Sequence, residues 1–287
     1  MNLGKLGVWY FTDLMSANKA AEAAQRIEAL GYSALWIPEA VGRNPFAHAA
    51  WLLAKTQKLI VATGIASIYH REPGVTMAGQ KTLAEQSNNR FLLGLGVSHK
   101  PMVEGVRGLE YGKPVETMRN YLAKMDASPY SAVQPSEAPP RVIAALGPKM
   151  LELARDTCAG AHPYFSSPDH TAMARKVLGP KPWLCVEQKV ILETDATKAR
   201  ALGRAGAAMY LTLPNYRNNW LRSGMRKQTS PTAVRTNSST RRLRGARSTR
   251  SRRASKRTST PARATSAFSR SIQTARSATC TGRRSKS

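Results

Sequence analysis

The chain has 287 residues, enough for one large domain or two small ones, and it carries a formal net charge of +27. No apolar run is long enough to cross a membrane, no secretory signal is evident, and the three cysteines lie too far apart for a disulfide framework or a zinc site. These features exclude an integral membrane protein and a disulfide-rich secreted domain, and they predict a cytoplasmic protein without a bound metal.

Short apolar runs alternate with segments of helical periodicity from residue 6 to residue 211. The apolar runs predict strands at Leu6–Phe11, Ala34–Pro38, Leu59–Ile68, Phe91–Val97, Arg141–Leu146, Ala161–Phe165 and Leu184–Leu192. Helices are predicted at Asn18–Leu30, Pro45–Lys55, Thr76–Ser87, Val115–Ala127, Pro148–Thr157, Pro168–Leu178 and Asp195–Leu211.

This alternation of strands and helices predicts a parallel sheet. The strands are nearly continuous apolar runs, as expected when both faces of a sheet are covered. The size and the repeat favour an α/β fold of the TIM (β/α)8 barrel type that is incomplete, because one strand–helix unit is missing. A doubly wound sheet of seven strands is the alternative.

The end of the chain has a different composition. Residues 1–222 hold 26 Lys and Arg and 17 Asp and Glu, whereas the last 65 residues hold 18 Lys and Arg, 25 Ser and Thr and no acidic residue. We therefore expect a barrel domain over 1–222 and an Arg/Ser/Thr-rich, low-complexity, disordered tail over 223–287.

Two origins for the tail stay open, an evolved basic arm and a reading-frame slip near Arg222 or Ser223. In a frame shifted by one base, a Ser codon of the TCN type forces an aliphatic residue or Phe into the hidden reading. Ser248, Ser251, Ser255 and Ser259 have helical spacing, so the hidden reading would contain an amphipathic helix. We favour the slip, which would have removed the eighth strand–helix unit and could leave a non-functional product.

The active site of a βα barrel lies at the carboxyl ends of its strands. Glu39 follows the second predicted strand, His162 lies in the sixth and Glu187 in the seventh. Carboxylate and imidazole groups hold and transfer protons, so these three residues are the catalytic candidates. Simpler interpretations stay open, because His162 could serve the turn at Pro163 and Glu187 could pair with Lys189.

Two loops are suited to an anion. One is the small turn Gly96–Ser98 after the fourth predicted strand. The other follows the fifth strand, where Gly147 precedes Pro148 at a helix start with Lys149 beside it, so that free N–H groups, the helix dipole and a cation coincide. An ordinary turn and an ordinary helix start are the alternatives.

Five segments taken together resemble a known family. In chain order they are GYSALWIPEAVGRNPF, VATGIASIYHREP, NNRFLLGLGVSH, RVIAALGPKMLELA and GAHPYF. The chain is similar to the bacterial luciferase-like monooxygenase superfamily and, within it, most resembles the F420-dependent oxidoreductases of actinobacteria. The resemblance covers nearly all of residues 3–221.

The resemblance implies a barrel that binds coenzyme F420, or alternatively FMN, and transfers a hydride between the deazaflavin and a small organic substrate. It also implies a bulge at the end of the third strand, with a non-prolyl cis peptide at Gly64–Ile65 behind the central ring of the cofactor. The cofactor-binding residues that it implies are Thr63, Gly64, Ile65, Ala66, Gly96, Val97, Ser98, Ala145, Leu146, Gly147, Pro148 and Lys149.

One motif departs from the family pattern. Sugar-phosphate dehydrogenases of this branch carry an Asp–His pair where this chain has Glu39 and Ala40, which argues against the same oxidation of a sugar phosphate. An FMN-dependent monooxygenase that uses reduced flavin and O2 is the near alternative. Nucleic-acid binding through the tail is disfavoured, because Phe268 is its one aromatic residue and base stacking needs several. We expect a small-molecule substrate, no membrane partner, and a homodimer if the frame is intact.

Overall fold

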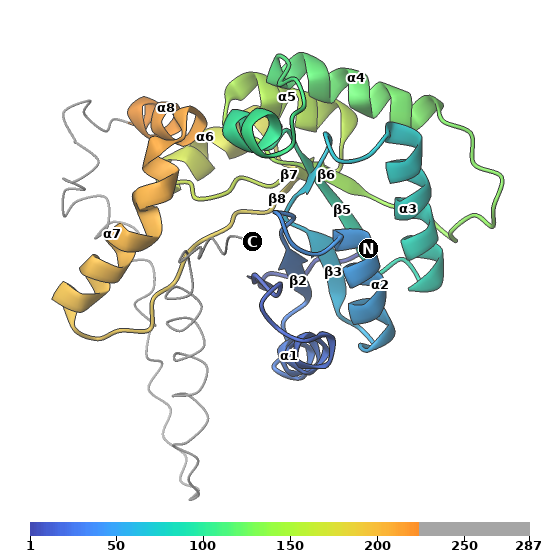
Figure 1. The fold of residues 1–287 in the computed structure, drawn as a ribbon, viewed down its shortest axis with the longest axis horizontal. Helices are drawn as coiled ribbons and strands as arrows, with labels where there is room; N and C mark the ends of the chain where they lie inside the picture. The colour runs from blue at the N-terminus through green and yellow to red at the C-terminus, as the bar shows by residue number, and fades with distance from the viewer. Residues whose placement is uncertain (224–287) are drawn as a thin grey trace, which may run out of the picture. The chain divides into compact units, whose positions relative to one another are not determined.

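The computed structural model of the chain describes residues 1–223 (Figure 1), so the predicted tail and its shifted frame lie outside the described residues. The strands are β1 (Gly7–Trp9), β2 (Ala34–Ile37), β3 (Ile60–Thr63), β4 (Ala66–Ser67), β5 (Phe91–Gly96), β6 (Arg141–Ile143), β7 (Gly160–Ala161) and β8 (Trp183–Leu184). The helices are α1 (Ala17–Ala29), α2 (Pro45–Ala54), α3 (Pro73–Gln86), the π-helix η1 (Pro101–Val106), α4 (Pro114–Ala127), α5 (Pro148–Thr157), α6 (Pro168–Leu178), α7 (Ala196–Thr212) and α8 (Pro214–Arg222).

The strands form one 8-stranded parallel sheet in the order β1-β2-β3-β5-β6-β7-β8, with β4 paired to β5. Strands that follow one another along the chain are neighbours in the sheet, and Figure 1 shows helices α2 to α6 around them. Within the described residues β1 and β8 form the two ends of the order and do not pair with each other. The sheet is therefore an incomplete (β/α)8 barrel, as the sequence predicts.

Side chains alternate between the two faces of the sheet, as the pleat of a strand requires. In β2, Leu35 and Ile37 join the large core between strands and helices, whereas Trp36 joins an inner cluster with Ala62 and Leu92. All five are buried. Burying one such large side chain contributes about 1.5–3 kcal/mol, so both faces hold the strands in place.

Most of the described helices begin with a proline in the first turn, and in α2, α3 and α6 a side chain also caps the N-terminus. Asn44 accepts hydrogen bonds from the N–H groups of Phe46 and Ala47 at the start of α2. The start of α5 has no side-chain cap, because Gly147 occupies the capping position. Pro148 has no N–H and the Met150 N–H donates to the Gly147 carbonyl oxygen at 3.1 Å, so the Lys149 N–H is the group of this first turn that a ligand could use.

The chain between Leu59 and Ile68 departs from the predicted single strand. The peptide bond Gly64–Ile65 is cis, as the family resemblance implies, and it separates β3 from β4. Strand β3 pairs with the first half of β5, at Phe91 and Leu92, whereas β4 pairs with its end, at Leu95 and Gly96. The interruption between β3 and β4 therefore lies at the carboxyl edge of the sheet.

The last predicted strand is mostly wrong. Leu184–Leu192 was expected to be extended, but β8 ends at Leu184 and the chain then runs irregularly to α7. Within the described residues β7 is the one neighbour of β8, and β7 itself ends at Ala161. Beyond Leu184 the two segments are joined by single backbone hydrogen bonds, from the Cys185 N–H to Ala161 and from the Glu187 N–H to Pro163, without a regular strand. The sequence also gave no sign of the short helices η1 and α8.

The chain divides into two compact units. One contains the whole sheet, over Met1–Lys189, and resumes at Ala207 within α7. The other contains, among the described residues, Val190–Gly206, where Asp195 caps the start of α7 by accepting hydrogen bonds from the N–H groups of Thr197 and Lys198. No helix of residues 1–223 is both long and apolar enough to cross a lipid bilayer.

Candidate functional site

The cis peptide Gly64–Ile65 is held by hydrogen bonds from three directions. The indole Nε1 of Trp9 donates to the Gly64 carbonyl oxygen at 2.8 Å, and the Gly64 N–H donates to Ile37 at 2.8 Å. The N–H of Glu39 donates to the Ile65 carbonyl oxygen at 3.2 Å. The ends of β1 and β2 therefore fix this peptide in place.

The strand beside the cis peptide approaches it closely because it lacks side chains there. A Cβ on Gly94 would lie 2.0 Å from the Thr63 carbonyl oxygen, and a Cβ on Gly96 would lie 2.6 Å from the Ile65 side chain. The buried Thr63 hydroxyl exchanges hydrogen bonds with the backbone of Gly94, at 2.7 and 2.8 Å. The structure thus brings the predicted residues Thr63 to Ala66 together with Gly96 on one small-residue surface.

Glu39 is enclosed by hydrogen-bond donors. Its carboxylate accepts from the Ser67 N–H at 2.7 Å, from the Arg71 guanidinium through both nitrogens, and pairs with His70 Nδ1 at 3.2 Å. Burial acts to raise the pKa of Glu39, but these donors stabilise the charged form more, so the pKa lies below its ordinary value of 4.5. Glu39 is a carboxylate that anchors the loop after the cis peptide.

His162 lies in the barrel interior beneath the same peptide. Its ring stacks on Trp36 with centroids 4.5 Å apart, and its Nδ1 contacts the Cys185 carbonyl oxygen at 2.7 Å. A carbonyl oxygen only accepts, so Nδ1 carries the proton and Nε2 is a bare acceptor. Nε2 has no hydrogen-bond partner among residues 1–223 and lies 3.2 Å from where a Cβ of Gly64 would be. Burial lowers the pKa of His162 to about 4, so the ring is neutral at physiological pH.

Glu187 belongs to a different group of side chains. Its buried carboxylate accepts from the Phe165 N–H at 2.9 Å and pairs with Lys189 at 3.4 Å. The Lys189 ammonium donates to the Tyr164 hydroxyl at 2.7 Å, and that hydroxyl lies 2.8 Å from the hydroxyl of Tyr210. Glu187 thus holds together the loops that follow β7 and β8.

The predicted phosphate loop lies at the start of α5. An idealised Cβ on Gly147 would have the two terminal nitrogens of Arg222 as its nearest atoms, at 3.8 and 3.9 Å. The imidazole Nε2 of His170 contacts the Leu146 carbonyl oxygen at 2.9 Å, while Ala145 is buried and Lys149 is exposed. A guanidinium therefore faces the positive end of a helix dipole, an arrangement that an anion between them would stabilise.

The structure brings these predicted residues into four neighbourhoods: the cis-peptide surface with His162, the Glu39 network, the Glu187–Lys189 group and the Gly147 loop. Sequence reasoning missed the roles of Trp9, Arg71 and Arg222, whereas it offered Lys189 as a partner of Glu187, as the structure shows. For Trp9 the usable signal was its place in the first predicted strand, Leu6–Phe11.

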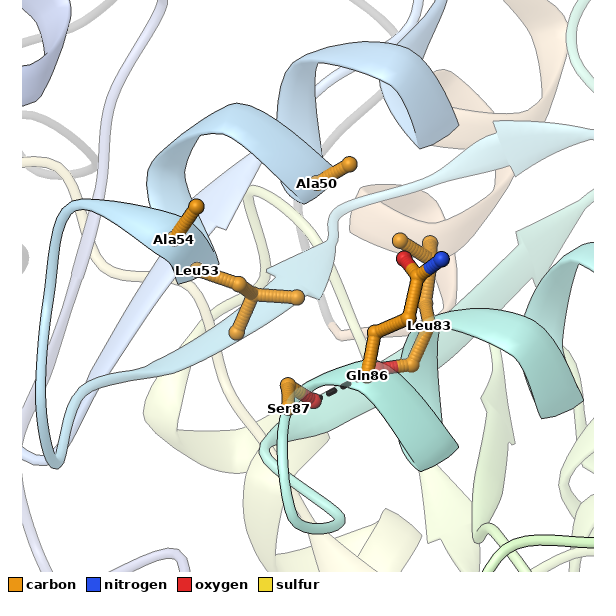
Figure 2. A pocket seen from close by; sticks show the side chains of 6 residues that line it. All are labelled: Ala50, Leu53, Ala54, Leu83, Gln86 and Ser87. Atoms are coloured by element: carbon orange, nitrogen blue, oxygen red, sulfur yellow. Dashed lines mark hydrogen bonds between the residues drawn. The ribbon is translucent and has the colours of Figure 1, made fainter.

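A cavity of about 260 Å³ lies elsewhere, between α2 and α3 (Figure 2). It is lined by Ala50, Leu53, Ala54, Leu83, Gln86 and Ser87. These residues lie toward the C-terminal ends of their helices, which places the cavity near the amino ends of the strands and away from the candidate site. Among residues 1–223 no cluster of three or more His, Cys, Asp or Glu side chains has a geometry that could hold a metal ion.

Comparisons with known proteins identify the family and the fold. Residues 3–258 match the family model of luciferase-like monooxygenases. The chain is 27% identical over 256 residues to a putative coenzyme F420-dependent oxidoreductase of Mycobacterium tuberculosis, with 74% of this chain and 72% of the relative covered. Other curated relatives match over shorter stretches, and the chain spans about half of their length.

Two solved structures illustrate the shared fold. An F420-dependent secondary alcohol dehydrogenase in complex with an F420–acetone adduct has a TM-score of 0.64 at 15% identity, with 83% of this chain and 85% of that chain covered. The FMN-bound oxygenating constituent of a type II Baeyer–Villiger monooxygenase from Pseudomonas putida has a TM-score of 0.53 at 16% identity, with coverage of 71% and 72%.

Proposed function

The chain belongs to the luciferase-like monooxygenase family, and from this premise we propose that it is an oxidoreductase that exchanges a hydride between coenzyme F420 and a small organic substrate. The observation that carries the proposal is the close packing of Gly94 and Gly96 against the segment Thr63–Ala66 at the carboxyl edge of the sheet. When bound, the deazaflavin supplies the hydride chemistry, while the protein supplies position and proton management.

The residues at this edge fit a planar ring with a phosphate-bearing tail. Gly64 and Gly96 are buried, and the Ile65 side chain lies over Gly96, so the partly exposed Ile65 is the part of this segment against which a ring would pack. His162 Nε2 is a buried acceptor that lacks a donor, which indicates that a polar ligand or water completes it. The Gly147 loop with Arg222 would receive the phosphate, with Lys149 and Ser98 as further contacts.

We assign distinct roles to the three acid–base candidates. Glu39 is fully engaged by Arg71 and Ser67, so it positions the loop after the cis peptide and does not release a proton near neutral pH. His162 stays neutral and offers its Nε2 as a hydrogen-bond acceptor. Glu187 orients Lys189 at the mouth of the barrel.

Cofactor binding to the full 287-residue chain tests the proposal. Coenzyme F420 and FMN are titrated separately, and binding is followed by quenching of cofactor fluorescence. We expect F420 to bind, and we expect Arg222→Met to weaken its binding by about tenfold through loss of a charge-assisted contact. Arg217→Met on the same helix is the matched control, and riboflavin, which has no phosphate, should be insensitive to both changes.

The alternative is an FMN-dependent monooxygenase, and the FMN-bound structural neighbour favours it. Tight binding of FMN together with no binding of F420 would establish that alternative. Binding of neither cofactor by the folded chain would exclude both.

A further inference from the structure

Four aromatic rings surround the ammonium group of Lys189. The distances from its Nζ to the ring centroids are 4.5 Å for Tyr164, 4.9 Å for Tyr210, 5.3 Å for Phe165 and 5.7 Å for Trp9. Aromatic faces attract a cation but solvate it less well than water does. The rings therefore replace part of the water around the Lys189 ammonium, which is also paired with the Glu187 carboxylate.

The hydrogen bonds at Lys189 have a defined direction. An ammonium group only donates, so the Tyr164 oxygen accepts at 2.7 Å, and Tyr164 and Tyr210 share a further hydrogen bond of 2.8 Å. Burial and the nearby Glu187 carboxylate raise the pKa of Tyr164, so its phenol keeps its proton. Lys189 and Tyr164 thus place an ammonium and a neutral hydroxyl side by side.

This group adjoins the cis-peptide surface and is partly exposed to solvent. Tyr164 packs on Trp9 with ring centroids 5.2 Å apart, and the Trp9 indole holds the Gly64 carbonyl oxygen. The Lys189 side chain is 31% exposed, so a molecule arriving from solvent can reach it. The aromatic walls match a flat, apolar body.

We propose that Lys189 and Tyr164 form an oxyanion-recognition site that binds the oxygen atom of a phenol or an aryl carbonyl compound, with the aromatic walls around them holding its ring. As a statement about the substrate, the proposal rests on the proposed oxidoreductase function and names the substrate class. As a statement about binding, it stands independently of any cofactor.

The purely structural alternative is that Lys189 only ties the loops after β7 and β8 together through Glu187 and Tyr164. The two hypotheses predict different relative affinities for an added phenolate and for a neutral ring. A recognition site distinguishes a phenolate from a neutral ring of the same shape, whereas a loop tie does not.

The test uses 4-nitrophenol, because its anion is yellow and its neutral form is nearly colourless. The probe is titrated into the full-length chain, without cofactor, at a mildly acidic pH at which the free phenol is mostly protonated. We expect it to bind as the yellow anion, and 4-nitrotoluene, which lacks the hydroxyl, to bind at least about tenfold more weakly. This comparison needs no variant and so does not depend on how a mutant folds.

Variants then assign the effect to residues. Lys189→Met should abolish the yellow shift and weaken binding by about tenfold or more, Lys189→Arg should retain the shift, and Tyr164→Phe should weaken binding severalfold. Tyr216→Phe is the matched control, because the Tyr216 ring touches Tyr164 but its hydroxyl takes no part in the Lys189 hydrogen bonds.

Two outcomes would overturn the proposal: equal binding of 4-nitrophenol and 4-nitrotoluene, or an unchanged yellow shift in a folded Lys189→Met chain. Neither outcome depends on whether F420 binds. A failed oxyanion site and a failed cofactor assignment are therefore distinguishable.

Discussion

At the scale of single residues, the hydrogen-bond partners of a side chain determine its role in the site more than its residue type does. Glu39 and Glu187 are both buried glutamates near the site. Glu39 is surrounded by donors that stabilise its charge, whereas Glu187 shares its carboxylate between a backbone N–H and Lys189. The sequence marked both as candidates, but it could not supply their partners, because Arg71 and Phe165 come from neighbouring loops.

Neutralising Glu39 tests its anchoring role. Glu39→Gln leaves the buried Arg71 guanidinium without its counter-charge, so we expect the free energy of unfolding to fall by about 3 kcal/mol in urea denaturation. Glu22→Gln is the control, because its pair with Lys19 is exposed and contributes about 0–1 kcal/mol. Equal effects of the two substitutions would contradict the anchoring role.

The same network predicts a pH dependence. The folded pKa of Glu39 lies below the ordinary value of 4.5. Its stabilising contribution is therefore present above pH 4.5 and is lost as the pH falls through the lowered folded pKa. The loss of stability in acid should be less steep for Glu39→Gln than for the unmodified chain, measured by urea denaturation over that range.

His162 predicts a loss of stability in a milder range. Its pKa falls from the ordinary 6.5 to about 4, so between these values the unfolded chain binds a proton that the folded chain does not. Stability should therefore decrease from pH 6.5 down to about 4, by roughly 3 kcal/mol. In His162→Asn the fall in the free energy of unfolding between pH 6.5 and about 4 should vanish. Above pH 7, the difference in the free energy of unfolding between the two proteins measures the packing lost with the imidazole ring. A parallel pH dependence in both proteins would exclude the assignment.

At the scale of elements, the bounds of helices and strands were predicted best where an apolar repeat continues over several turns. Helices α5 and α6 have the predicted bounds, because several turns repeat the same apolar face. The sequence of Leu59–Ile68 predicts one continuous strand, but the cis peptide at Gly64–Ile65 divides this segment into two strands. The pattern of apolar residues carries no information on the conformation of a single peptide bond. Only the family resemblance supplied that feature. The irregular chain after β8 was missed because strand length depends on the neighbouring strand, which local sequence does not encode.

Adding one methyl group tests the close approach of β3 and β5. In Gly94→Ala the new Cβ would lie 2.0 Å from the Thr63 carbonyl oxygen, so the strands must separate and stability should fall by about 3 kcal/mol. Gly105→Ala in η1 is the control, because nothing lies within 4 Å of its Cβ position. That control should be neutral or slightly stabilising in the same denaturation experiment. A tolerated Gly94→Ala would show that the two strands are not packed this closely.

At the scale of the whole molecule, the described part of the sheet has two ends, β1 and β8, that do not pair with each other. Unpaired strand edges promote association between chains. The excess of basic residues lies mostly in the last 65 residues, beyond this sheet, so the net charge of +27 says little about the barrel and its site.

The reading-frame hypothesis gives the prediction at this scale. The source gene, sequenced through the codons for Trp220 to Ser230, should show a slip relative to a frame that encodes an eighth strand–helix unit. A chain made in the restored frame should stay monodisperse in light scattering at concentrations where the 287-residue chain associates. A single intact frame ending at Ser287 in the source gene would defeat the hypothesis.

The Trp9 hydrogen bond couples the order of β1 to the order of the cis-peptide surface. Trp9 lies in β1, an end strand of the described sheet, and its indole holds the Gly64 carbonyl oxygen of the cis peptide. A contact that reduces the motion of β1 therefore also reduces the motion of the surface proposed for the cofactor ring. Thermodynamic reciprocity then requires that a ligand on that surface stiffen β1 in return. Amide hydrogen exchange in β1, far along the chain from the loops that would touch the ligand, becomes a reporter of occupancy.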